Sequence, residues 1–217
     1  MNPKIGVFDS GMGGVSVAQA IKEELPEHEV LFVNDAEHLP YGSKPAKELL
    51  GYVVPILENL VEQGCEVIVI ACNTVTTTLI DQLREIIPIP LVGMEPMVKP
   101  AAEKTKSGTI AICATPTTLN SKRYTWLKET YAKGVTVLEP DCNDWAFMIE
   151  TNKIDRHKVA TRIDEACKMG ADVIVLGCTH YHWIEDMIKE VAGNRARVLQ
   201  PEVPVIAQLK KVIATLS

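Results

Sequence analysis

The stretch "ADVIVLGCTHYHW" (171–183) runs four branched apolar residues into a glycine, a cysteine, a threonine and a histidine. A second stretch, "CEVIVIACNTVTT" (65–77), has nearly the same pattern. Continuous apolar runs of this length are typical of strands that a parallel sheet buries on both faces. We therefore predict two buried parallel strands, each with a cysteine directly after its last residue.

The two stretches belong to an internal repeat. Residues 64–72 resemble residues 170–178, and residues 5–10 resemble residues 110–115 at nearly the same offset along the chain. One match between buried strands would mean little, because such strands share a composition. Two matches in register at one offset favour two similar lobes.

Other short apolar runs alternate with helical patterns, in which apolar residues recur every three or four positions, as from Leu49 to Leu60. This alternation predicts an α/β fold of two similar lobes, each a mainly parallel sheet flanked by helices. We expect a pseudo-twofold relation between them, with the active site in the cleft. The expected lobes are 1–95, joined by a last helix over 205–217, and 96–204. The predicted strands are 5–8, 30–34, 67–71, 91–92, 109–114, 135–138, 173–177 and 198–199.

Composition excludes some classes of protein. The net charge of -6 argues against a nucleic-acid binder, which usually has a basic face. No apolar run is long enough to cross a bilayer, and the N-terminus lacks the pattern of a signal peptide. We therefore expect a cytoplasmic protein without a membrane partner, whose six cysteines are free thiols.

Polar side chains follow the ends of four predicted strands. Because ligands of open α/β sheets bind at the carboxyl ends of the strands, these clusters would line one site. That site would contain one thiol from each lobe. The clusters are Asp9 with Ser10, residues 72–74, Thr115 with residues 117–118, and residues 178–180.

Four interpretations of the thiol pair compete. Both cysteines could be structural, since cysteine is often buried, but each is followed at once by polar residues. A metal site of Cys178, His180 and His182 lacks a second compact ligand pair, so we expect no metal. Catalysis by Cys178 alone, with His180 as its base, leaves Cys72 without a role. Proton transfer on opposite faces of one carbon uses both thiols, and a repeated fold supplies that arrangement.

The glycine-rich stretch "DSGMGG" (9–14) does not match a nucleotide-binding turn. The third glycine of G-x-G-x-x-G is replaced by Ser16, and no Walker lysine follows. We interpret the glycines as a tight turn beside a small ligand.

Four motifs, in order, resemble the glutamate racemase family over essentially the whole chain: "DSGMGG" (9–14), "PYGSK" (40–44), "ACNT" (71–74) and "GCTHY" (177–181). The resemblance implies interconversion of L- and D-glutamate without a cofactor, supplying D-glutamate for peptidoglycan, and is compatible with a homodimer. It implies that Cys72 and Cys178 are the catalytic thiols, assisted by Asp9 and His180 respectively, with Glu150 near the second thiol. The residues it assigns to the substrate are Ser10, Pro40, Tyr41, Gly42, Asn73, Thr74, Thr118 and Thr179.

The sequence departs from the family pattern at three places. Thr117 stands where the family usually has glycine, His182 stands where it has proline, and residues 139–150 replace a more apolar segment. Two alternatives therefore stay open. One is a racemase of the same family that acts on aspartate or another small acid, and the other is a glutamate-binding homologue with altered catalysis.

Overall fold

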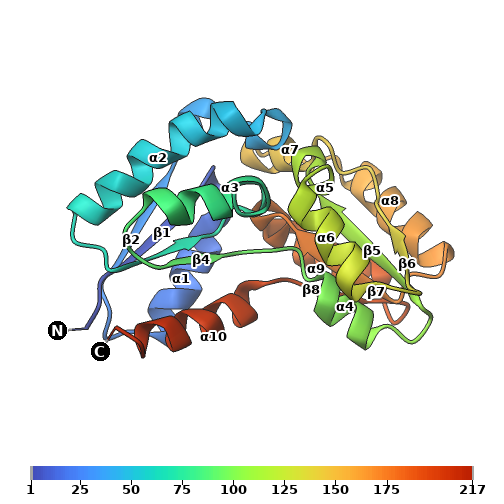
Figure 1. Ribbon diagram of the computed structural model, residues 1–217. Coiled ribbons are helices and arrows are strands. Elements are labelled where there is room, and N and C mark those ends of the chain that lie inside the picture. Colours follow the sequence, from blue (N-terminus) through green and yellow to red (C-terminus); the bar gives the residue numbers. More distant parts are fainter. Residues whose placement is uncertain (1, 217) are drawn as a thin grey trace.

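The computed structural model describes residues 2–216 and shows two four-stranded sheets, one in each lobe (Figure 1). The strand order is β2-β1-β3-β4 in the first sheet and β6-β5-β7-β8 in the second, and every pairing is parallel. The predicted fold class is confirmed. The strands are β1 (Ile5–Asp9), β2 (Val30–Asn34), β3 (Val67–Ile70), β4 (Leu91–Gly93), β5 (Thr109–Ala114), β6 (Thr136–Leu138), β7 (Val173–Gly177) and β8 (Arg197–Leu199).

Helices connect the strands and cover both faces of each sheet. Those around the first sheet are α1 (Val15–Glu24), α2 (Ala46–Glu62), α3 (Asn73–Ile86) and α10 (Glu202–Ile213). Those of the second lobe are α4 (Val98–Lys104), α5 (Pro116–Leu119), α6 (Lys122–Tyr131), α7 (Trp145–Glu150), α8 (Arg156–Lys168) and α9 (Glu185–Ala192). Short 3-10 turns complete the chain: η1 (Met12–Gly14), η2 (Ala36–His38), η3 (Tyr41–Ser43) and η4 (Thr179–Ile184).

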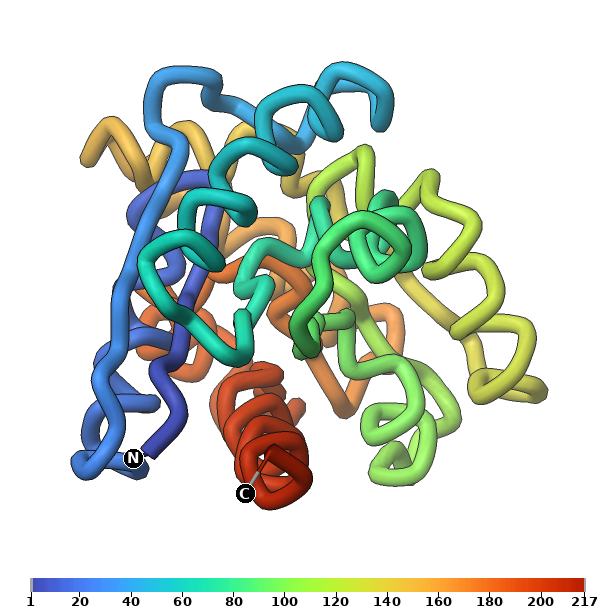
Figure 2. The backbone as a smooth tube through the Cα atoms, turned by 60° about the vertical axis from the view of Figure 1, so that its left-hand side comes forward, coloured from blue at the N-terminus to red at the C-terminus, as the bar shows by residue number. Residues whose placement is uncertain are grey.

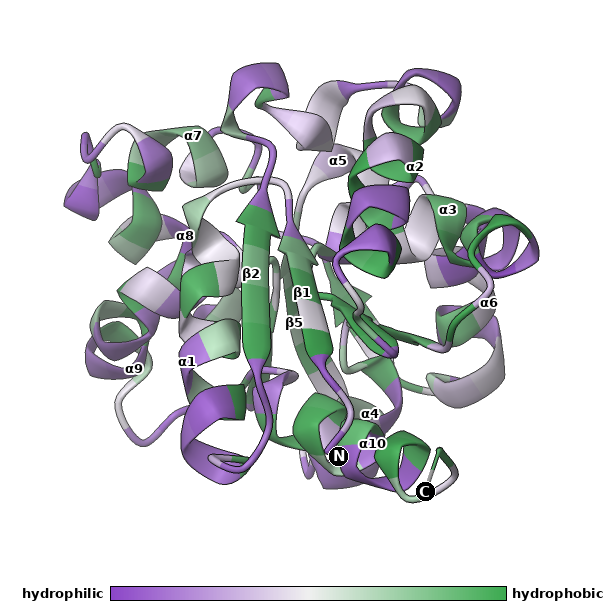
Figure 3. Ribbon diagram, turned by 90° about the vertical axis from the view of Figure 1, so that its left-hand side faces the viewer, coloured by the Kyte–Doolittle hydropathy of each residue, from purple (hydrophilic) through white to green (hydrophobic). Residues whose placement is uncertain are grey.

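The apolar side chains of the strands pack against helices on both sides. In the first lobe, Phe8 and Ile70 face α2 and α3, while Ile5 and Val7 face α1 and α10. Burial on both faces explains why these strands are continuously apolar. Figure 3 shows the same pattern, with hydrophobic strands inside and hydrophilic stretches on the outer helices.

The last helix, α10, packs on the first lobe, against α1 and β4 (Figure 2). The predicted bounds of this helix, 205–217, were wrong, because α10 begins at Glu202 and ends at Ile213, and residue 217 lies outside the described residues. Pro204 fits inside its first turn, where a backbone N–H would have no helical partner. From this packing we propose the division into 1–95 with 205–217, and 96–204.

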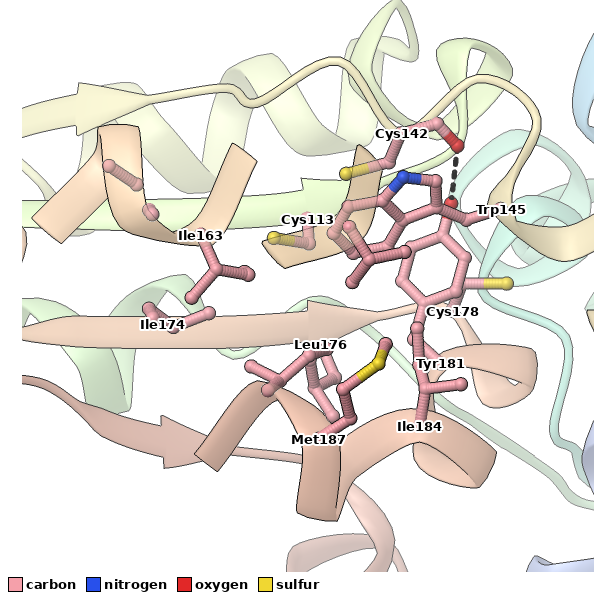
Figure 4. Close-up of a cluster of buried hydrophobic side chains, with 14 of the residues drawn as sticks. Cys113, Cys142, Trp145, Ile163, Ile174, Leu176, Cys178, Tyr181, Ile184 and Met187 are labelled. Carbon is pink, nitrogen blue, oxygen red and sulfur yellow. Dashed lines mark hydrogen bonds between the residues drawn. The ribbon is translucent and has the colours of Figure 1, made fainter. Parts of the chain in front are cut away.

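An aromatic pair fixes the part of the second lobe that faces the first. The Trp145 and Tyr181 rings meet edge to face at 5.3 Å, and the Tyr181 hydroxyl donates to the Cys142 carbonyl at 3.0 Å (Figure 4). Trp145 begins α7 and Tyr181 lies in η4. This pair therefore holds together two elements that reach the cleft.

No helix within residues 2–216 has both the length and the apolar character that a membrane span needs.

Candidate active site

A cavity of about 320 Å³ lies between the lobes, at the carboxyl ends of the strands. Of the site residues that the family resemblance assigns, all except Asp9 and Thr118 line it. The expected lining residues are Ser10, Pro40, Tyr41, Gly42, Cys72, Asn73, Thr74, Glu150, Cys178, Thr179 and His180. The structure thus brings residues from both halves of the repeat to one cavity.

The two thiols enter this cavity from equivalent positions. Cys72 lies at the N-cap of α3, just beyond β3, and is 4% exposed. Cys178 lies just beyond β7, before η4, and is 8% exposed. Figure 4 shows Cys178 at the edge of the apolar cluster of the second lobe. Each lobe therefore contributes one nearly buried thiol from the end of a central strand.

A line of proton-carrying groups leads away from Cys178. Its sulfur lies 3.8 Å from Nδ1 of His180, and Nε2 of His180 lies 2.5 Å from Oε2 of Glu150. The Met12 backbone N–H donates to the same Glu150 oxygen at 3.2 Å. A carboxylate on one side of an imidazole stabilises the imidazolium that forms when the other side takes a proton. His180 can therefore accept the thiol proton and return it.

The surroundings of Cys72 are different. Its thiol donates to the Ser10 hydroxyl at 3.5 Å. The Asp9 carboxylate, expected beside Cys72, accepts from the Gly14 N–H at 2.6 Å and from the Thr179 hydroxyl at 3.1 Å. Its second oxygen, Oδ1, is buried without a hydrogen-bond partner among the described residues. Asp9 therefore lies behind the cavity wall, tied to the second lobe, with one oxygen able to accept a proton.

Burial dominates the proton affinities of both thiols. It raises the pKa of Cys72 to about 12, with a further contribution from the Asp9 charge. It also raises the pKa of Cys178, with further contributions from Cys72 and Asp9. Burial likewise raises the pKa of Asp9, although the charge of His180 opposes it. Burial therefore favours the protonated form of both thiols at neutral pH, and a positive charge bound between them would favour the thiolate.

Hydroxyl groups join the lobes along another wall of the cavity. The Thr74 hydroxyl, in α3, lies 2.9 Å from that of Thr115, which precedes α5. Thr118 lies 3.0 Å from Thr115 and is fully buried. Thr118 thus supports the wall through Thr115 rather than lining the cavity as expected.

Tyr41 and Asn73, both expected to bind the substrate, have polar atoms that already bond to the protein. The Tyr41 hydroxyl donates to Asp35 at 2.6 Å, so this side chain presents its ring and not a free hydroxyl to the cavity. The Asn73 amide donates to the Met94 carbonyl at 3.0 Å. Its own oxygen is buried without a partner among residues 2–216, so it can accept from a bound ammonium group.

The sequence did not identify every lining residue. Thr115 was expected among the strand-end clusters, Ser43 lies within the motif 40–44, and Leu39 and Pro116 directly neighbour expected residues. Asn143, Ala146 and Phe147 had no signal, because they lie in and before α7, in the segment that departs from the family pattern. Phe147 is 58% exposed. It contributes an apolar surface to the rim of the cavity.

His182, which departs from the family pattern, lies in η4 beyond His180. Burial and the charge of His180 lower the pKa of His182 to about 4. Its ring is therefore neutral at physiological pH. No group of three His, Cys, Asp or Glu side chains within residues 2–216 could hold a metal ion.

Comparisons with known proteins agree with this geometry. A family model described as Asp/Glu/hydantoin racemase matches residues 5–212. The glutamate racemase of Ralstonia nicotianae is 37% identical over 216 residues, which cover 97% of this chain and 77% of that protein.

Two crystal structures illustrate the shared fold. A glutamate racemase isoform of Bacillus anthracis is 28% identical, with a TM-score of 0.84 over 99% of this chain and 83% of that chain. The Escherichia coli glutamate racemase, solved with L-glutamate and the activator UDP-MurNAc-Ala, is 25% identical. Its TM-score is 0.86 over 99% of this chain and 83% of that chain.

Proposed function

The chain belongs to the Asp/Glu/hydantoin racemase family. We propose that it interconverts L- and D-glutamate by proton transfer at the α-carbon, with one thiol on each face of that carbon. The observation that carries this proposal is the pair Cys72 and Cys178, which reach one cavity from equivalent strand ends of two similar lobes. The choice of glutamate as the substrate rests on the relatives that are named glutamate racemase.

In the proposed reaction, one cysteine acts as a thiolate and the other as a thiol. The thiolate removes the α-proton of glutamate, and the electron pair of the broken C–H bond stays on the substrate. The opposite thiol then donates its proton to the other face of the same carbon, which inverts the configuration. The enzyme is left with its thiol and thiolate exchanged.

The neighbouring groups fit this exchange of roles. His180, backed by Glu150, can take the proton of Cys178 before L- or D-glutamate reacts and can return it afterwards. On the other side, Ser10 contacts Cys72 and Asp9 lies behind it. The substrate ammonium would place a positive charge near both thiols, which lowers the pKa of each.

Among residues 2–216, the lining of the cavity includes no lysine or arginine. The two carboxylates of glutamate would therefore be bound by neutral donors. The hydroxyls of Ser10, Ser43 and Thr179 line the cavity, and the N-terminus of α3 begins directly after Cys72. Backbone N–H groups at a helix N-terminus bind anions well.

The test is the change in circular dichroism of L-glutamate, D-glutamate and both enantiomers of aspartate with the purified protein. We expect racemisation of glutamate from either enantiomer, and its loss in Cys72→Ala and in Cys178→Ala. Cys65→Ala and Cys167→Ala, which change cysteines outside the cavity, serve as controls and should remain active. Racemisation by either cavity variant at the wild-type rate would refute the two-thiol mechanism, and turnover of aspartate alone would refute the substrate.

We further propose that the D-glutamate serves peptidoglycan synthesis in the cytoplasm, by a chain that can form a homodimer. The resemblance to glutamate racemases supports this setting.

A further inference from the structure

One hydrogen bond between the lobes lies outside the catalytic groups. The Thr117 hydroxyl, in α5 of the second lobe, donates to the Gly42 carbonyl, in η3 of the first lobe, at 2.6 Å. Gly42 lines the cavity, whereas Thr117 does not. Thr117 can therefore influence a bound ligand only through the turn that it holds.

The turn lies directly against the start of α5. A Cβ atom added at Gly42 would lie 2.8 Å from Cβ of Thr115 and 2.9 Å from its Cγ2. Only glycine allows the backbone to approach this closely. The position of the turn is therefore set by a close contact at Thr115 and by the hydrogen bond from Thr117.

The hydrogen bond also fixes the orientation of a peptide group. The Gly42 carbonyl and the Ser43 N–H belong to one planar trans peptide, so they point in opposite directions. Holding the carbonyl on the second lobe therefore fixes the direction of the Ser43 N–H. Both residues line the cavity, whose described lining residues include no lysine or arginine.

We propose that Thr117 is a positioning residue, whose hydroxyl holds the 41–43 turn against the second lobe and so strengthens the binding of glutamate. This inference rests on the proposed racemisation of glutamate. Cys72 and Cys178 are held by other elements. Loss of the Thr117 hydroxyl therefore weakens the binding of the substrate and of the transition state equally, which raises KM and leaves kcat nearly unchanged.

The experiment compares Thr117→Val, which keeps the shape of the side chain without the hydroxyl, with Thr117→Ser, which keeps the hydroxyl. The control is Asn120→Ala, which removes a hydrogen bond at the C-terminal end of α5, from the Asn120 side-chain amide to the Pro116 carbonyl at 2.9 Å. For each variant, kcat and KM are measured in both directions by circular dichroism, the Kd of L-glutamate by calorimetry, and the melting temperature. If Thr117→Val does not fold, Thr117→Ala is measured in its place.

For Thr117→Val we expect KM and Kd to rise roughly 2- to 12-fold, the range that the loss of one hydrogen bond gives, with kcat within about two-fold. Thr117→Ser and Asn120→Ala should keep the wild-type KM. A wild-type KM and Kd in Thr117→Val, or a fall in kcat as large as that in kcat/KM, would overturn the inference. If the wild-type protein binds glutamate without racemising it, the proposed function fails and the Kd ratio alone decides the role of Thr117. Absence of binding would overturn both.

Discussion

Replacing Glu150 with glutamine tests whether the carboxylate acts through His180. The Glu150 Oε2 atom lies 2.5 Å from Nε2 of His180, and the His180 side chain is 4% exposed. Glutamine keeps the size of the side chain and a carbonyl that can still accept from the Met12 N–H. The substitution therefore removes the negative charge and leaves the local packing in place.

The expected loss follows from the type of hydrogen bond. A hydrogen bond to a charged group contributes about 1.5–3 kcal/mol, and a neutral one about 0.5–1.5 kcal/mol. The carboxylate therefore stabilises an imidazolium by about 1–2 kcal/mol more than the amide does. Since the imidazolium forms when Cys178 loses its proton, we expect kcat/KM to fall roughly 5- to 30-fold in Glu150→Gln.

The assay follows the change in circular dichroism from L-glutamate and from D-glutamate. Because enantiomers have equal free energies, kcat/KM must fall by the same factor in both directions. The control is Glu139→Gln, which changes a carboxylate of the same lobe that accepts from Tyr124 at 2.9 Å and lies outside the cavity. A kcat/KM of Glu150→Gln within about two-fold of wild type would refute a role for the carboxylate in proton transfer.

Two further predictions concern stability. In Gly13→Ala the new Cβ would lie 2.6 Å from the His180 backbone nitrogen, so we expect a loss of about 1–3 kcal/mol in unfolding free energy, together with loss of racemisation. The control Gly51→Ala, where a Cβ meets nothing within 4 Å, should be neutral or stabilising in denaturant unfolding. For Asp172, burial alone would raise the pKa, but hydrogen bonds from the Thr105 hydroxyl and two backbone N–H groups lower it to about 2. Asp172→Asn should therefore lower the unfolding free energy by about 1 kcal/mol at neutral pH, discounted for partial exposure, and the difference from wild type should shrink as the pH falls from about 4 towards 2. A difference that stays constant over that pH range would contradict this assignment.

The sequence predicted the central strands of the sheets well because both of their faces are buried. The predicted strands 109–114 and 173–177 match β5 and β7 at both ends, and 30–34 matches the partly exposed edge strand β2. Continuous apolar runs leave little ambiguity at such positions. The start of α10 was less predictable, since Pro204 is compatible both with a helix start and with the loop before one.

Part of the site could not be predicted, because it depends on how the lobes meet. The hydrogen bond from Thr179 to Asp9 joins residues far apart in the sequence, and no local sequence pattern predicts it. The same holds for Thr117 and Gly42. Phe147 lies at the cavity because Trp145 anchors α7 in the core of the second lobe. Such contacts follow from tertiary packing and not from residue type or spacing.

The two-thiol mechanism is tested most directly by the position of deuterium when L-glutamate reacts in deuterium oxide. We expect the D-glutamate formed early in the reaction to carry solvent deuterium at its α-carbon, while the remaining L-glutamate keeps its protium. This is because one thiol takes the proton and the other delivers a deuteron. Deuterium that appears equally in the remaining L-glutamate from the start would show a single base serving both faces. D-glutamate that retains protium would show that the proton removed is the proton returned, which would exclude two separate thiols.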